Sequence, residues 1–151
     1  MTTTNEETVG RFTEWYQQTP VSLEFWEGIL TNQRLIWCFV GESFKSLLLR
    51  ADMGTYGREE IIDLQPDAVA TFDDRNTVVP LEALRMIRLN PGSLIRRPSL
   101  VIEWNRNNRQ YTFKLKGTSD GDSQTSLVES LAEDERLSHV DITIEQSRFG
   151  W

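Results

Sequence analysis

Residues 100–115 carry the pattern that most restricts what this chain can fold into. Apolar side chains occupy alternate positions on both sides of the polar stretch NRNN at 105–108; they are Leu100, Ile102 and Trp104 before it and Tyr111, Phe113 and Leu115 after it. Period-two alternation is typical of strands with one face on a core and the other in water. The segment therefore predicts a β-hairpin closed by a four-residue turn.

Similar runs predict further strands along the chain. The clearest, Leu35–Val40, is six apolar residues long and lies between the polar turn TNQ at 31–33 and Gly41. It is far too short to span a membrane, and its aromatic and β-branched residues favour a strand buried on both faces, either within the core or with one face under a helix. Outside the hairpin, strands are expected at 21–29, 34–40, 44–50, 76–80, 85–90 and 139–145, with a turn at 41–43.

Two segments have apolar residues at helical spacing. Val9, Phe12 and Tyr16 predict a short amphipathic helix over residues 6–18, ended by a proline, and an apolar stripe predicts a second helix over 123–132. The whole pattern is mainly β: an antiparallel meander of about seven strands that curls into a barrel or a two-sheet sandwich, capped by the C-terminal helix. The N-terminal helix and the strand at 139–145 are additions to this core.

Length and composition are those of a single globular domain spanning 1–151. The chain has 151 residues, of which 38% are hydrophobic and 26% charged, and its one cysteine, Cys38, has no partner for a disulfide within the chain. The acidic, polar N-terminus MTTTNEETVG is not a secretory signal, which favours a cytoplasmic protein. Few lysines with excess acid fit a halophilic source, although a GC-rich genome would give the same arginine bias.

The net charge of −7 hides an uneven distribution. Residues 1–75 carry 6 basic and 13 acidic side chains, residues 76–116 carry 8 and 2, and residues 117–151 carry 2 and 8. The middle third is therefore a basic island between acidic flanks. The acidic total disfavours binding to nucleic acid, and disfavours non-specific binding of the whole molecule to anionic membranes.

Two motifs resemble the pleckstrin-homology-like (PH-like) superfamily, in particular the bacterial PH and GRAM-type domains. The stretch LTNQRLIW at 30–37 is similar to the L-T-N-x-R-L pattern that joins the first two strands of those domains. The stretch VPLEALRMI at 79–87 resembles their I-P-x-x-x-I-x-x-I segment before a mid-barrel strand, and the order of terminal hairpin and helix also matches. The resemblance covers about residues 22–132 and implies a PH-like fold. It implies a function only weakly, because this fold hosts lipid binders, peptide binders and oligomer-forming modules.

The basic island supplies the candidate sites for lipid or another anion. Arg96 and Arg97 are adjacent in the loop NPGSLIRRP at 90–98, beside the aliphatic Leu94 and Ile95. Arginine binds phosphate with a planar fork, and neighbouring aliphatic residues could insert into a bilayer. Other basic residues could extend this site, namely Arg88 and Arg106. The alternative is that these arginines pair with the acidic flanks of the same chain.

Aromatic residues supply the candidate sites for a protein partner. Phe149 and Trp151 lie in the terminal stretch SRFGW, and Trp26 shares a predicted strand face with Glu24, so it is expected either on the surface or under a helix. Cys38 lies between aromatic residues and is expected to be a buried structural thiol. We find no set of residues typical of a catalytic, metal or cofactor site, and we expect a protein that is not an enzyme.

The leading hypothesis is a PH-like module that mediates protein–protein interaction or self-assembly, through an exposed strand edge or the end of the barrel. A second hypothesis is peripheral binding to anionic lipid through residues 94–97. A third is a carrier of a small apolar ligand inside the barrel, although the bulky residues suggest a filled interior.

Overall fold

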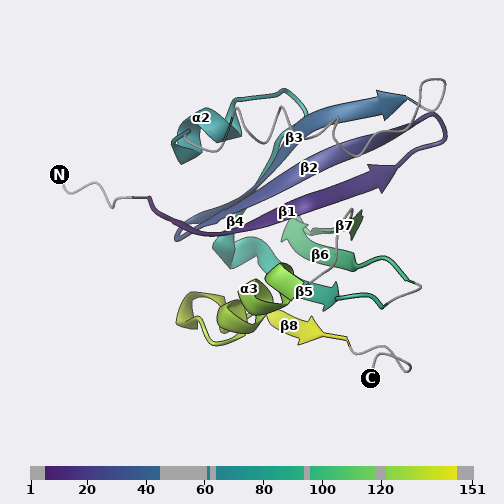
Figure 1. Cartoon of the computed structure of the whole chain (residues 1–151). Helices are drawn as coiled ribbons and strands as arrows, with labels where there is room; N and C mark the ends of the chain where they lie inside the picture. The colour runs from purple at the N-terminus through teal and green to yellow at the C-terminus, as the bar shows by residue number, and fades with distance from the viewer. Residues whose placement is uncertain (1–5, 45–60, 62–63, 94–95, 118–121, 146–151) are drawn as a thin grey trace.

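The computed structural model describes residues 6–44, 61, 64–93, 96–117 and 122–145, and it is built mainly of strands (Figure 1). The strands are β1 (Thr8–Gln18), β2 (Ser22–Thr31), β3 (Arg34–Phe44), β4 (Thr77–Pro80), β5 (Leu84–Asn90), β6 (Ser99–Arg106), β7 (Arg109–Gly117) and β8 (Asp141–Ile144). The helical elements are α2 (Pro66–Ala70), α3 (Asp122–Ala132) and the 3-10 turns η2 (Leu81–Ala83) and η3 (Glu135–Leu137). Among the described helices, none is long and apolar enough to cross a bilayer.

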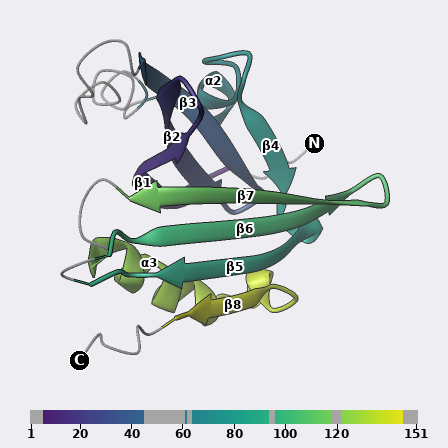
Figure 2. The same ribbon diagram turned by 90° about the vertical axis from the view of Figure 1, so that its right-hand side faces the viewer.

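The strands form one sheet in the order β4-β3-β2-β1-β7-β6-β5-β8. The sheet is folded into two layers: the first layer contains β4, β3, β2 and β1, and the second contains β7, β6, β5 and β8 (Figures 1 and 2). Among the described residues, strand pairing between the layers covers two residue pairs, Trp15 with Gly117 and Tyr16 with Lys116. Figure 2 shows β5, β6 and β7 running across the strands of the first layer, with α3 behind them. The mainly β architecture with a C-terminal helix is confirmed.

The core lies between the two layers, and a second apolar cluster lies outside the first layer. Successive residues of β3 point alternately into the core and into the second cluster. Leu35, Trp37 and Phe39 face the core, while Ile36 and Cys38 face the second cluster. The second cluster includes a residue of α2 and packs beneath that helix. The prediction that the run 35–40 is a strand buried on both faces is therefore confirmed.

The first element is a strand, and the predicted helix over 6–18 is wrong. β1 contains a bulge between Phe12 and Trp15, where Glu14 has a φ of 66°. The extra residue places Phe12 and Trp15, which are three positions apart, on the same face, and both are fully buried. A bulged strand can therefore show the spacing of a helix. It also follows that LTNQRLIW joins the second and third strands instead of the first two.

Three smaller expectations are also corrected. β3 runs through Gly41–Ser43, where a turn was expected, because the pairing with β2 continues to Phe44; residues 45–50 of the predicted next strand lie outside the described residues. The hairpin turn has two residues, Asn107 and Asn108, instead of four. The last strand, β8, pairs in parallel with β5, so the sheet is mixed.

Candidate functional site

Hydrogen bonds within the segment between β5 and β6 fix the turn at Gly92. The Gly92 N–H donates to Asn90 Oδ1 at 2.9 Å, and the Ser93 N–H donates to the Arg96 carbonyl at 2.9 Å. Gly92 has a φ of +81°, and a Cβ there would lie 2.6 Å from the Arg96 carbonyl oxygen. The glycine is therefore needed for the turn that presents Arg96 and Arg97.

Two lysines of β7 lie beside this loop. Lys116 is paired with Ser99, which follows Arg97 by two residues, so the loop and the end of β7 are neighbours. Lys114 lies two positions earlier on β7, and its side chain projects on the same side as that of Lys116, away from the core. We call the set Arg96, Arg97, Lys114 and Lys116 the basic face.

The basic face carries charge that the described part of the chain does not neutralise. All four residues are exposed, and none of their side chains forms an ion pair with a described residue. Arg88 differs, because its Nε lies 3.3 Å from a carboxylate oxygen of Glu145. Pairing with the acidic flanks, the alternative left open by the sequence, therefore applies to Arg88, and among the described residues it does not apply to the basic face.

The predicted anion-binding residues do not all come together. Arg96 and Arg97 are adjacent, but Arg106 lies at the other end of β6, seven residues beyond Ser99, which is roughly 23 Å along an extended strand. Leu94 and Ile95, the aliphatic residues expected to insert, lie outside the described residues. Lys114 and Lys116 were not among the predicted site residues, although strand alternation alone places both on the polar face of the hairpin.

The expectation for Trp26 as a partner-binding residue needs correction. Trp26 is buried in the core, with its ring centroid 5.5 Å from that of Phe39 and 5.2 Å from that of Phe113. The alternation of β2 is regular, but both of its faces are covered: Trp26 faces the core between the layers, while Phe25 faces the second apolar cluster. The other two candidates, Phe149 and Trp151, lie outside the described residues.

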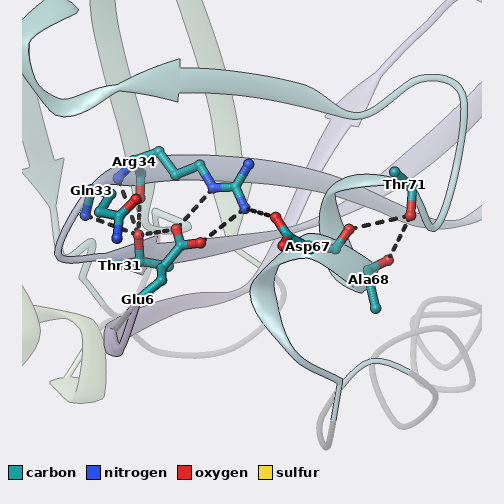
Figure 3. A network of polar contacts seen from close by, with 7 residues as sticks. All are labelled: Glu6, Thr31, Gln33, Arg34, Asp67, Ala68 and Thr71. Atoms are coloured by element: carbon teal, nitrogen blue, oxygen red, sulfur yellow. Dashed lines mark hydrogen bonds and ion pairs between the residues drawn. The ribbon is translucent and has the colours of Figure 1, made fainter. Parts of the chain in front are cut away.

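The L-T-N-x-R motif builds a polar clamp around the turn between β2 and β3 (Figure 3). The Thr31 hydroxyl accepts hydrogen bonds from the N–H groups of Gln33 and Arg34 and donates to Glu6 at 2.6 Å. The Arg34 guanidinium binds Glu6 at 2.8 and 2.9 Å and Asp67 at 2.6 Å, and its hydrogen bond lowers the pKa of Glu6 below the ordinary 4.5. These contacts tie the chain before β1 and the helix α2 to the turn, so they are structural.

Cys38 and His139 have structural surroundings. Burial raises the pKa of Cys38 to about 11, so its thiol is protonated at neutral pH. The Cys38 sulfur accepts a hydrogen bond from Asn76 Nδ2 at 3.3 Å, and His139 Nε2 lies 2.8 Å from the Leu81 carbonyl oxygen. Within the described ranges, no three of the residue types His, Cys, Asp and Glu gather as metal ligands would.

Comparison with known proteins supports the fold. The hSac2 domain from the human phosphoinositide phosphatase Sac2 is similar, with a TM-score of 0.56 and 13% identity over 96% of this chain and 79% of that chain. The Vps36 N-terminal PH domain aligns with a TM-score of 0.39 and 15% identity over 85% of this chain and 83% of that chain. No protein-family model and no curated protein gives a match. The strand order and the C-terminal helix define a two-layer, mainly β sandwich, and the likeness to the hSac2 domain is one of fold.

Proposed function

We propose that this chain is a non-enzymatic binding module that docks on an anionic lipid surface through the basic face. The observation that carries the proposal is the nearness of Arg96 and Arg97, just before β6, to Lys114 and Lys116 on the part of β7 that pairs with the start of β6; all four are exposed and without ion-pair partners among the described residues. The net charge of −7 acts against this binding, but 21 of the 23 acidic residues lie in the flanks, 13 in 1–75 and 8 in 117–151, outside the segment that carries the basic face.

The chemistry of these four side chains suits phosphate headgroups. Arginine forks bind phosphate oxygens bidentately, and lysine adds mobile point charges. Each basic residue near an anionic bilayer contributes roughly 1 kcal/mol, so four of them together can hold a protein at the surface. Salt screens these interactions over about 10 Å at 0.1 M, so binding should weaken as the ionic strength rises.

The other functions suggested by the sequence have different support. Bulky rings occupy the interior, where Trp37 lies 5.8 Å from Phe12 and 5.0 Å from Phe113 between centroids, which argues against an apolar ligand inside the barrel. Interaction with a protein partner remains a prediction for the tail, and an open strand edge gives it a separate basis, described below.

Co-sedimentation with vesicles tests the lipid proposal. Vesicles of phosphatidylcholine with phosphatidylserine should retain the wild type at low ionic strength, while vesicles of phosphatidylcholine alone should not. The double variant R96E/R97E should bind more weakly by a factor of at least about 30. Two contacts of roughly 1 kcal/mol are lost, and two repulsions add to that loss. The matched control is R106E/R109E, which makes the same charge change at the other end of the hairpin.

Two outcomes would reject this function. One is the absence of wild-type binding to the anionic vesicles at low ionic strength. The other is an equal loss of binding in both double variants, since that would reflect net charge alone and not the basic face.

A further inference from the structure

The end of the β6–β7 hairpin presents two arginines and two aromatic rings on one face. Asn107 and Asn108 have φ values of 53° and 64°, which define a two-residue type I′ turn. Across the hairpin, Arg106 is directly opposite Arg109. Trp104 is opposite Tyr111, and their rings stack with centroids 5.9 Å apart and planes 14° apart.

The two arginines are exposed, and they lack ion-pair partners within the part of the chain that the structure describes. Like charges directly opposite each other in an antiparallel pair are destabilising. The tight turn fixes this register, so Arg106 and Arg109 cannot move apart by slipping. Negative charge brought from outside the chain would remove the repulsion and could bind both guanidinium groups at once.

The same end of β7 has an open edge. β7 is nine residues long and pairs with β6 throughout, but its pairing with β1 is limited to Lys116 and Gly117. Gln17 adds one side-chain hydrogen bond, to the Lys114 carbonyl at 3.2 Å. Among the described residues, no strand pairs with the other edge over Arg109–Phe113. Figure 2 shows this end of the hairpin reaching past the strands of the first layer.

The backbone groups that point to this open edge can be identified from the register. In an antiparallel ladder, alternate residues turn their N–H and C=O groups to opposite sides. The Lys114 carbonyl turns toward β1, where it accepts a hydrogen bond from Gln17, so Gln110 and Thr112 turn their backbone groups to the same side. The Gly117 N–H, three positions from Lys114, turns the other way and donates to the Pro98 carbonyl. An extended peptide could form hydrogen bonds with both residues while β6 remains paired to the other edge.

We propose that an acidic, extended segment of a partner protein adds as a strand to the β7 edge at 109–113. Its backbone would pair with Gln110 and Thr112, and its carboxylates would bind Arg106 and Arg109. An apolar side chain of the segment would cover Tyr111, which is 39% exposed. Tyrosine, tryptophan and arginine are the residues that most often dominate binding energy at protein interfaces. This site is separate from the basic face, at the other end of the hairpin.

A simple peptide probe tests the site. The probe is a fluorescein-labelled peptide that repeats Glu-Thr-Val-Thr, so that glutamate and valine share one face of the extended chain, and the control peptide has lysine in place of glutamate. Fluorescence anisotropy at low ionic strength should show binding of the glutamate peptide only. We expect R106E/R109E to weaken that binding about tenfold or more, whereas R96E/R97E, the matched charge control, leaves it unchanged.

Hydrogen exchange measured by NMR separates strand addition from mere charge attraction. The amide protons of Gln110 and Thr112 should exchange more slowly with the glutamate peptide present. T112P removes one of these donors without breaking a bond to β6, and it should abolish the protection; if it disturbs the fold, R106E/R109E still tests the site.

Several results would overturn the proposal. They are the absence of binding, equal binding of the lysine peptide, and protection at residues other than Gln110 and Thr112. Protection that grows with protein concentration in the absence of peptide would identify a second copy of this chain as the occupant. Loss of vesicle binding in R106E/R109E together with no peptide binding would assign the arginines to a membrane instead.

Discussion

Trp15 donates its indole N–H to the side-chain oxygen of Gln124 at 2.8 Å, and this contact joins the bulge of β1 to the helix α3. The same Gln124 oxygen accepts the Thr13 N–H at 3.0 Å, and the Gln124 amide nitrogen donates to the Arg11 carbonyl at 3.2 Å. A bulge leaves backbone groups without partners in the neighbouring strand. One buried amide therefore satisfies the groups on either side of the bulge in β1.

Replacing this amide should destabilise the domain. Gln124→Leu would leave the buried donors of Trp15 and Thr13 without an acceptor, at roughly 1–3 kcal/mol for each. We expect the free energy of unfolding to fall by about 2–4 kcal/mol in urea titrations. Glu129→Gln, at an exposed position of the same helix, should change it by less than about 0.5 kcal/mol. Equal stabilities of Gln124→Leu and wild type would contradict this role for the amide.

The bulge also explains where sequence reasoning about this fold failed. Strand alternation correctly identified β6 and β7, because that hairpin is regular and has one face on the core. In β1 the extra residue places Phe12 and Trp15 on one face at a spacing of three, which is the spacing of a helix. The partner that stabilises the bulge, Gln124, lies more than a hundred residues further along the chain. No local pattern could reveal such a contact.

The candidate sites were predictable to different degrees. Arg96 and Arg97 are adjacent in the sequence and follow a Pro-Gly turn, so composition alone indicated them. The nearness of Lys116 depends on the pairing with Ser99, and the open edge of β7 depends on how few residues of β1 reach it. These are relations between strands, and they become visible only when the register is known.

Gly28 should tolerate no side chain. A Cβ at this position would lie 2.7 Å from the Trp37 ring and 3.1 Å from Phe12 Cβ, within the packed core. Gly28→Ala should lower the free energy of unfolding by about 1–3 kcal/mol, as overpacking does. Gly10→Ala is the matched control, because the contact there is the end of the flexible Leu127 side chain, which can rotate away. A larger loss in Gly10→Ala than in Gly28→Ala would show that the core has more room than the packing indicates.

The clamp at the β2–β3 turn should make stability depend on pH. The hydrogen bond from Arg34 lowers the pKa of Glu6, so this contribution is present above the ordinary value of 4.5 and is lost as the pH falls through the lower, folded value. Glu6→Gln should therefore reduce stability by about 1–2 kcal/mol at neutral pH, and the difference from wild type should shrink in acid. Unfolding titrations over a pH series measure it. Glu7→Gln serves as the control, and a difference that is constant with pH would exclude an ion-pair origin.

Changing Gly92 should weaken lipid binding without removing any charge. Alanine at this position must adopt a φ near +81°, and its Cβ would lie 2.6 Å from the Arg96 carbonyl oxygen, so the turn that presents Arg96 and Arg97 has to open. We expect Gly92→Ala to lose about 1–3 kcal/mol of stability. Its binding to phosphatidylserine vesicles should also fall, although all four residues of the basic face remain.

The comparison with R96E/R97E separates the shape of the loop from its charge. That double variant should lose vesicle binding and keep wild-type stability, because its side chains are exposed and unpaired among the described residues. Gly92→Ala should lose part of both. If Gly92→Ala instead binds vesicles as well as the wild type does, the four residues of the basic face act through their total positive charge. The geometry of the loop is then not part of the site.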